Sequence, residues 1–203
     1  MRTHLTSLLF LLCCTLWLSA VGHAQTGYEL RGEGDTSMRV LGSSTLHDWE
    51  METANVTGDA VFVLADATEP ALEAIKNLSF ALRVEDLKSG NKGLDNNAYD
   101  ALQAEEYPRI AYQLTSATLS PQAKGQLAKT RGRLTIAGTT RDIEMDVFVV
   151  VNADASVTCK GSYSLSMTDY DVTPPSFMLG VMKTGDVITL HFSVTYEKSS
   201  EGA

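Results

Sequence analysis

Cysteine is scarce in this chain of 203 residues. Three cysteines occur, and two of them, Cys13 and Cys14, lie in an apolar run near the N-terminus. If that run is cleaved off as a signal peptide, as argued below for residues 1–24, Cys159 has no second cysteine with which to form an intramolecular disulfide. The scarcity excludes a small disulfide-stapled fold, so we expect packing alone to hold the chain together.

Three further shortages narrow the function. After residue 24 there is no run of about 18 or more apolar residues, so we expect no membrane span. Basic residues are outnumbered, 16 Lys and Arg against 25 Asp and Glu, and the formal net charge of −9 disfavours nucleic acid as a partner. Only His47 and His191 follow residue 24, and they are too far apart in the sequence to indicate a zinc site.

The N-terminal apolar run has the form of a secretory signal peptide. Arg2 precedes the run LTSLLFLLCCTLWLSAV, and Gly22-His23-Ala24 places small residues at the −3 and −1 positions that signal peptidase requires. We therefore predict a signal peptide over residues 1–24, with cleavage after Ala24.

A lipoprotein signal is the less favoured alternative, because Leu12 stands before Cys13 where a small residue is expected. The remainder, residues 25–203, has the length of one domain and contains no internal repeat. We predict a single domain in the periplasm or outside the cell.

Apolar and polar residues alternate through most of that remainder. In Ser156–Thr168 the apolar or small residues occupy every odd position, which is typical of a half-buried strand. The alternation places Cys159 on the core face and, in the run Ile188–Tyr196, His191 on the polar face. Further strands are expected at Met38–Trp49, Thr57–Leu64, Leu78–Val84, Ile110–Leu114, Leu127–Ile136 and Ile143–Val149.

Turn residues separate several of these strands. Ala137-Gly138-Thr139 and Lys183-Thr184-Gly185-Asp186 are expected hairpin turns, and Gly132 is expected to mark a β-bulge. About eight strands joined in this way predict an all-β fold, a closed antiparallel β-barrel, since closure removes exposed sheet edges. A barrel of that size encloses either packed side chains or one small apolar ligand, and the alternation does not distinguish the two.

Two short helices are also predicted, each covering a barrel end. The first begins at Thr68 as its cap, with Pro70 in the first turn and Leu72 and Ile75 spaced by three. The second begins at Asp95, carries Tyr99 and Leu102, and ends before Tyr107-Pro108.

Three separated segments resemble the YceI-like family of lipid-binding or polyisoprenoid-binding proteins. They are GSSTLHDWE at 42–50, ALQAEEYPRIAY at 101–112, and the stretch at 132–192 from GRLTIAGTTRDIEM to MTDYDVTPPSFMLGVMKTGDVITLHF. The resemblance implies a lipocalin-like, eight-stranded barrel whose apolar cavity holds an isoprenoid, a quinone or a fatty-acid-like lipid. It further implies that a homodimer is possible and that neither a cofactor nor a metal is needed.

Inward-facing residues of the predicted barrel are the expected ligand contacts. His47 is expected near the polar head group, with a core histidine bonded to a backbone carbonyl as an equally open alternative. Trp49 is expected to plug the barrel or to touch the ligand. Phe177 and Met178 follow Pro174-Pro175 and are expected to gate the cavity from a loop. The other expected contacts are Phe80, Leu82, Tyr112, Leu114, Leu165, Met167, Ile188 and Leu190.

Two other functions are alternatives to lipid binding. A filled barrel would make the protein a secreted interaction or stress-response module. A weak lipid-ester hydrolase is suggested by Ser43, Ser44, His47 and Asp48, but His47 and Asp48 point to opposite faces of an extended strand, so we predict no enzyme.

The alternating carboxylates of Asp169 and Asp171 suggest a cation site. It lacks the glycine turn and the bidentate glutamate of a calcium loop, so we expect a solvated strand end there.

Overall fold

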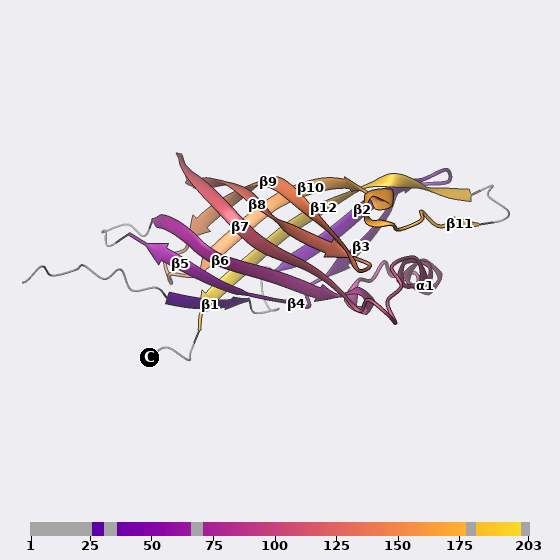
Figure 1. Cartoon of the computed structure of the whole chain (residues 1–203), viewed down its shortest axis with the longest axis horizontal. Helices are drawn as coiled ribbons and strands as arrows, with labels where there is room; N and C mark the ends of the chain where they lie inside the picture. The colour runs from indigo at the N-terminus through magenta and orange to yellow at the C-terminus, as the bar shows by residue number, and fades with distance from the viewer. Residues whose placement is uncertain (1–25, 31–35, 66–70, 178–181, 200–203) are drawn as a thin grey trace, which may run out of the picture.

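Eight antiparallel strands close into a ring in the computed structural model, which describes residues 26–30, 36–65, 71–177 and 182–199 (Figure 1). The predicted signal peptide lies outside these ranges. In hydrogen-bonded order the strands are β1 (Thr26–Leu30), β5 (Asp59–Leu64), β6 (Leu72–Arg83), β7 (Arg109–Gln122), β8 (Gly125–Ile136), β9 (Thr139–Val151), β10 (Val157–Ser166) and β12 (Met182–Lys198). Pairing of β1 with β12 closes the ring, which confirms the predicted all-β barrel.

Two more strands extend the wall at the end opposite β1. β2 (Ser37–Ser44) pairs with the first part of β12, and β3 (Trp49–Thr53) pairs with β2. The prediction of one strand from Met38 to Trp49 is therefore wrong. The Ser44 hydroxyl accepts the backbone N–H groups of Leu46 and His47 at 3.2 and 3.1 Å and so closes a turn between β2 and β3.

The first predicted helix is wrong at Leu72 and Ile75, which lie in strand β6, and its predicted start at Thr68 and Pro70 lies outside the described residues. β6 pairs with β5 through two register shifts, at which β6 contains one extra residue each, Lys76 and Glu73. Each extra residue changes which face the next side chain takes. Leu72, Ile75 and Leu78 thereby point inward at a spacing of three, which imitates a helix in the sequence.

The second predicted helix exists as α1 (Lys92–Ala101) but begins three residues before Asp95. Its cap is Asn91, whose Oδ1 accepts the backbone N–H groups of Gly93 and Leu94 at 2.9 and 3.2 Å. Asp95 instead accepts bonds from the backbone N–H and the hydroxyl of Ser89 at 2.8 and 2.7 Å. α1 lies at the barrel end opposite β1 (Figure 1), and no helix in the described ranges is long and apolar enough to cross a membrane.

The predicted turn at Ala137-Gly138 is confirmed. Ile136 pairs with Thr139, and the two intervening residues have φ angles of 45° and 76°, as a two-residue hairpin turn of this kind requires. The predicted bulge is displaced: Leu114 pairs with Gly132 and Ser116 with Arg131, so the extra residue is Thr115 in β7.

The predicted turn at Lys183–Asp186 is wrong, because those residues are part of β12, with a register irregularity between Thr184 and Ile188. Shorter elements complete the fold: β4 (Val56–Thr57) pairs with β6, and β11 (Ser176–Phe177) pairs with β12. Two 3-10 helices, η1 (Val84–Asp86) and η2 (Met167–Tyr170), follow β6 and β10.

An aromatic cluster fills the barrel at the β1 end. Phe62 is fully buried and meets the rings of Tyr28 and Tyr196 edge to face, with centroid distances of 5.0 and 5.6 Å. The Tyr196 hydroxyl donates to the Ser79 carbonyl at 2.8 Å, which ties β12 to β6 across the interior. We call this region the packed end.

Candidate ligand-binding cavity

A cavity of about 490 Å³ occupies the barrel between the packed end and α1. Its volume is within the range of about 300–1,000 Å³ that small-molecule sites occupy. The lining side chains come from β2, β3, β6–β10 and β12, from η2 and from α1, and most of them are apolar. The interior beside α1, called the hollow end below, is therefore open, which contradicts a barrel filled with side chains throughout.

The burial of side chains along β12 marks the change from packed to hollow. Val194 and Tyr196 face inward and are 4% and 1% exposed. Ile188 and Phe192 lie on the same inward face, and all four side chains border the cavity, but Ile188 and Phe192 are only partly buried. Their remaining exposed surface faces the cavity.

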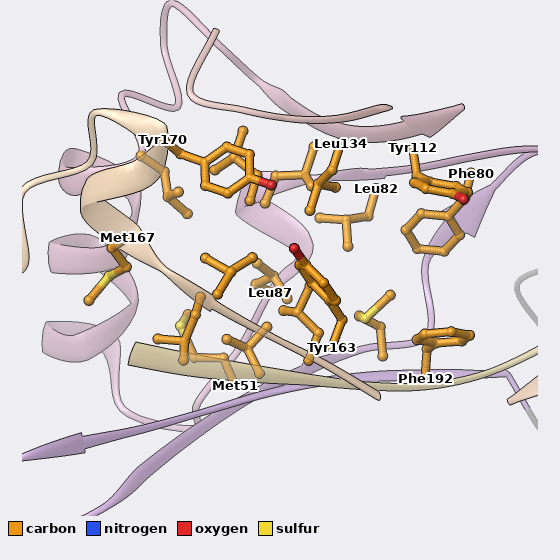
Figure 2. A pocket seen from close by; sticks show the side chains of 18 of the residues that line it. Met51, Phe80, Leu82, Leu87, Tyr112, Leu134, Tyr163, Met167, Tyr170 and Phe192 are labelled. Carbon is orange, nitrogen blue, oxygen red and sulfur yellow. The ribbon is translucent and has the colours of Figure 1, made fainter. Parts of the chain in front are cut away.

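Aromatic rings lie against glycines in the barrel wall, which keeps them out of the lumen. A Cβ built at Gly42 would collide with the ring of Trp49, one at Gly132 with Tyr112, and one at Gly161 with Phe192. Gly161 and Phe192 are directly paired residues of β10 and β12, and Phe192 and Tyr112 both line the cavity (Figure 2). The three glycines thus contribute to the open volume.

Ten of the twelve predicted ligand contacts line this cavity; their role as contacts stays a prediction. They are His47, Trp49, Phe80, Leu82, Tyr112, Leu114, Leu165, Met167, Ile188 and Leu190. Met178 and the side chain of Phe177 lie outside the described residues. Cys159 is buried and also lines the cavity, as the alternation predicted for its face. His191 is exposed, as predicted.

Several lining residues escaped the sequence-based prediction. The alternation of apolar and polar residues in β2 could have identified Met38 and Val40 as inward-facing. Leu94 and Ala98 line the cavity from α1, and no local sequence pattern shows that α1 packs against the barrel end. Tyr170 reaches it from η2.

Polar residues gather where the lining meets solvent, and we call this set the rim. The rim consists of Ser44, His47, Asn91, Asn97, Lys183 and Thr184. His47 is exposed, so it is not a core histidine, although its ring does bond a backbone carbonyl: Nδ1 donates to Asp48 at 2.8 Å. Trp49 is half-buried, and its Nε1 donates to the Ser43 carbonyl at 3.1 Å.

The residues that suggested a hydrolase serve the turn between β2 and β3. The Ser44 hydroxyl donates to the His47 carbonyl at 2.7 Å rather than to its ring. The imidazole Nδ1 meets the backbone of Asp48 and not its carboxylate. These contacts do not form the nucleophile–base–acid arrangement of a serine hydrolase.

Burial suppresses the acidity of the cavity's titratable side chains. It raises the pKa of the Cys159 thiol to about 12, so the thiol stays protonated and is a poor nucleophile. It also raises the pKa of Tyr170 to about 12 and shifts that of Tyr163 upward, and the charge of Asp169 adds to both shifts.

Among the described residues, the buried hydroxyls of Tyr28, Tyr112 and Tyr170 have no hydrogen-bond partner. Leaving such a group unpaired costs about 1–3 kcal/mol. Tyr112 and Tyr170 line the cavity, whereas Tyr28 belongs to the packed end.

The pair Asp169 and Asp171 is engaged in local structure. The Asp171 carboxylate accepts the Thr139 hydroxyl at 2.9 Å, and the Asp169 carbonyl accepts Nε of Arg141 at 2.6 Å. Within the described ranges, no three His, Cys, Asp or Glu side chains gather as a metal site would need.

The sequence profile of the YceI-like domain matches residues 35–196. BcnA of Burkholderia cenocepacia has a similar fold, with a TM-score of 0.61 and 17% identity over 79% of this chain and 95% of that chain. A polyisoprenoid-binding domain from Saccharophagus degradans gives 0.62 and 12% over 87% and 100%. The YceI protein of Campylobacter jejuni gives 0.52 and 20% over 70% and 82%. No curated protein matches the chain.

Proposed function

Because this chain belongs to the YceI-like family, we propose that it binds an amphipathic lipid of the isoprenoid type, without chemical turnover. The observation that carries the proposal is the apolar cavity of about 490 Å³ inside the barrel. The polyisoprenoid-binding domain of Saccharophagus degradans, which has the same fold, supports this ligand class. A quinone and a fatty-acid-like lipid are alternative ligands for the same cavity.

The lining and the rim suggest how such a ligand lies. Its apolar tail occupies the lumen toward Phe80 and Phe192, and its polar head stays near His47 and Lys183 at the rim. Affinity then comes mainly from burial of the tail, at about 0.8 kcal/mol for each CH₂ group, or a roughly fourfold gain in affinity for each.

Export to the periplasm completes the proposal. It rests on the signal peptide predicted over residues 1–24, with residues 25–203 as the mature domain. The gate at Phe177 and Met178, and the homodimer that the family resemblance implies, also remain proposals.

Native mass spectrometry of the protein purified from its own host tests the binding function directly. We expect an added mass of several hundred daltons that organic extraction removes. The variant Ile188→Trp inserts a large ring into the lumen and is expected to weaken lipid binding about 5- to 150-fold. Val187→Trp is the matched control, because Val187 is the preceding residue and is 59% exposed on the barrel surface.

If the wild-type protein carries no lipid and binds none from a panel of prenyl and acyl lipids, the proposed function is wrong. Equal binding by Ile188→Trp and Val187→Trp would place the lipid outside the barrel.

A further inference from the structure

The hollow end contains a polar feature that an all-hydrocarbon ligand would leave unused. Tyr170 is 2% exposed, its hydroxyl has no hydrogen-bond partner among the described residues, and its side chain lines the cavity. Native proteins pair nearly all buried polar groups with protein, water or ligand. A ligand atom that accepts a hydrogen bond would satisfy an unpaired donor that faces an open cavity.

A second hydroxyl lies near this one. Tyr163 on β10 also lines the cavity. Its electrostatic effect on the pKa of Tyr170 indicates that the two side chains lie close together. Figure 2 shows the hydroxyl ends of Tyr163 and Tyr170 both directed toward the middle of the cavity. Two donors on different elements are thus directed at one part of the lumen.

The surroundings favour a neutral acceptor over an anion. Burial raises the pKa of both Tyr163 and Tyr170, and the charge of Asp169 adds to both shifts, so these surroundings disfavour a negative charge. Arg141 acts in the opposite direction on Tyr170, but desolvation is the largest cause of the shift. A carboxylate or phosphate placed here would lose its hydration in an apolar space without a paired cation.

We propose that the hydroxyls of Tyr170 and Tyr163 bind a neutral carbonyl oxygen of the lipid, which makes the preferred ligand a ketone-bearing or ester-bearing lipid. This inference rests on the proposed function and specifies the chemistry of its ligand. Tyr170 and Tyr163 then select the ligand and hold its carbonyl at the α1 half of the cavity, with the tail directed toward the packed end.

Tyr112 is a weaker candidate for binding the lipid carbonyl, because the Thr130 side chain lies beside its hydroxyl. Tyr28 provides the control. Its hydroxyl is also buried and unpaired within the described residues, but Tyr28 belongs to the packed end and does not line the cavity.

Two probes of equal carbon number, a prenyl methyl ketone and a prenyl hydrocarbon, separate the possibilities. We expect wild-type protein to bind the ketone more tightly, and Tyr170→Phe to weaken ketone binding about 2- to 12-fold, which is the net contribution of one hydrogen bond. Hydrocarbon binding should not change in Tyr170→Phe. Tyr28→Phe should leave both affinities unchanged, and thermal unfolding would verify that each variant is folded.

The carbonyl stretching frequency of the bound ketone gives a readout that a structural role would not move. It should lie lower in the wild-type complex than in the Tyr170→Phe complex, because the hydrogen bond weakens the C=O bond. Tyr163→Phe should shift it in the same direction.

Equal affinity of wild-type protein for the two probes would overturn this inference while leaving lipid binding intact, and would assign the unpaired hydroxyls to water. The same holds if Tyr170→Phe weakens both probes equally. Binding of neither probe would overturn the proposed function together with this inference. Tighter binding of a fatty acid of matched length than of the ketone would contradict the neutral acceptor.

Discussion

The packed end and the hollow end are built by some of the same strands yet differ in what fills them. At the packed end, Phe62 of β5 packs against Tyr28 of β1 and Tyr196 of β12. At the hollow end, β2 and β3 replace β1 and β5 beside β12, and the large rings lie on glycines of the wall. The alternation of β12 is the same in both parts. Two features decide whether a part of the barrel is packed or hollow: which strand pairs with β12 there, and whether a wall glycine leaves room for each aromatic ring.

The difference predicts a division of labour in which the packed end supplies stability and the hollow end supplies binding. The largest expected effect is that of Phe62→Ala, which leaves a cavity among fully packed side chains. We expect a loss of about 3–5 kcal/mol in the free energy of unfolding, measured by chemical denaturation. Phe80→Ala is the matched exchange at the hollow end. Phe80 is only partly buried there, so we expect a smaller loss of stability.

Equal losses for Phe62→Ala and Phe80→Ala would contradict the division. Lipid affinity should behave in the opposite way, falling in Phe80→Ala and staying unchanged in folded Phe62→Ala protein.

Gly161→Ala tests whether the glycines keep the lumen open. The new Cβ would lie 2.6 Å from Cζ of Phe192, so the ring must move toward the lumen. We expect a cost in stability of about 1–3 kcal/mol and weaker lipid binding, measured by denaturation and by probe titration. Gly27→Ala is the control, because the nearest atom to its Cβ would be 3.9 Å away and lies outside the cavity. Unchanged affinity in Gly161→Ala would show that the ring does not restrict the ligand.

The attachment of α1 gives a smaller expected effect. Asn91→Ala removes the cap that accepts two backbone N–H groups, which costs about 1 kcal/mol. Since α1 lines the hollow end, the lipid should dissociate faster, as stopped-flow transfer to vesicles would measure. Asn96→Ala, at an exposed position in the middle of α1, should change neither quantity appreciably. Identical release rates in the two variants would exclude α1 from the exit path.

The smallest effect concerns pH, where no change from the buried tyrosines is expected below about pH 10. Burial raises the pKa of Tyr170 at the hollow end to about 12, and that of Tyr196 at the packed end well above 10. Above pH 10 the unfolded chain therefore binds fewer protons at these groups than the folded chain, and stability falls as pH rises. Denaturation at pH 9 and pH 11 should show this loss, and Tyr170→Phe should reduce it. An equal loss in Tyr170→Phe would assign the effect to other groups.

Much of the barrel follows from residue alternation, as the correct placement of Cys159 and His191 shows. The errors have local causes. Two bulges in β6 give Leu72 and Ile75 a helical spacing, and the Ser44 hydroxyl ends a strand that the apolar pattern would continue. The start of α1 could have been predicted from the sequence, since asparagine, the residue at position 91, is favoured as a helix cap.

The expectation of a hollow end rested mainly on the family resemblance. Empty volume depends on how the ring of Phe192 lies over Gly161 and how α1 docks against the barrel. Both are contacts between residues far apart in the chain, and neither leaves a periodic signal.

β12 also fixes the moment at which the protein becomes able to bind a ligand. It follows every other described strand in the chain, yet it pairs with β1, β2 and β10. The register joins Tyr28 to Lys198, a separation that makes ring closure a slow and late event in folding. Until β12 has been synthesised, the earlier strands form at most an open sheet. The cavity exists only after β12 has docked, so lipid loading follows the completion of synthesis.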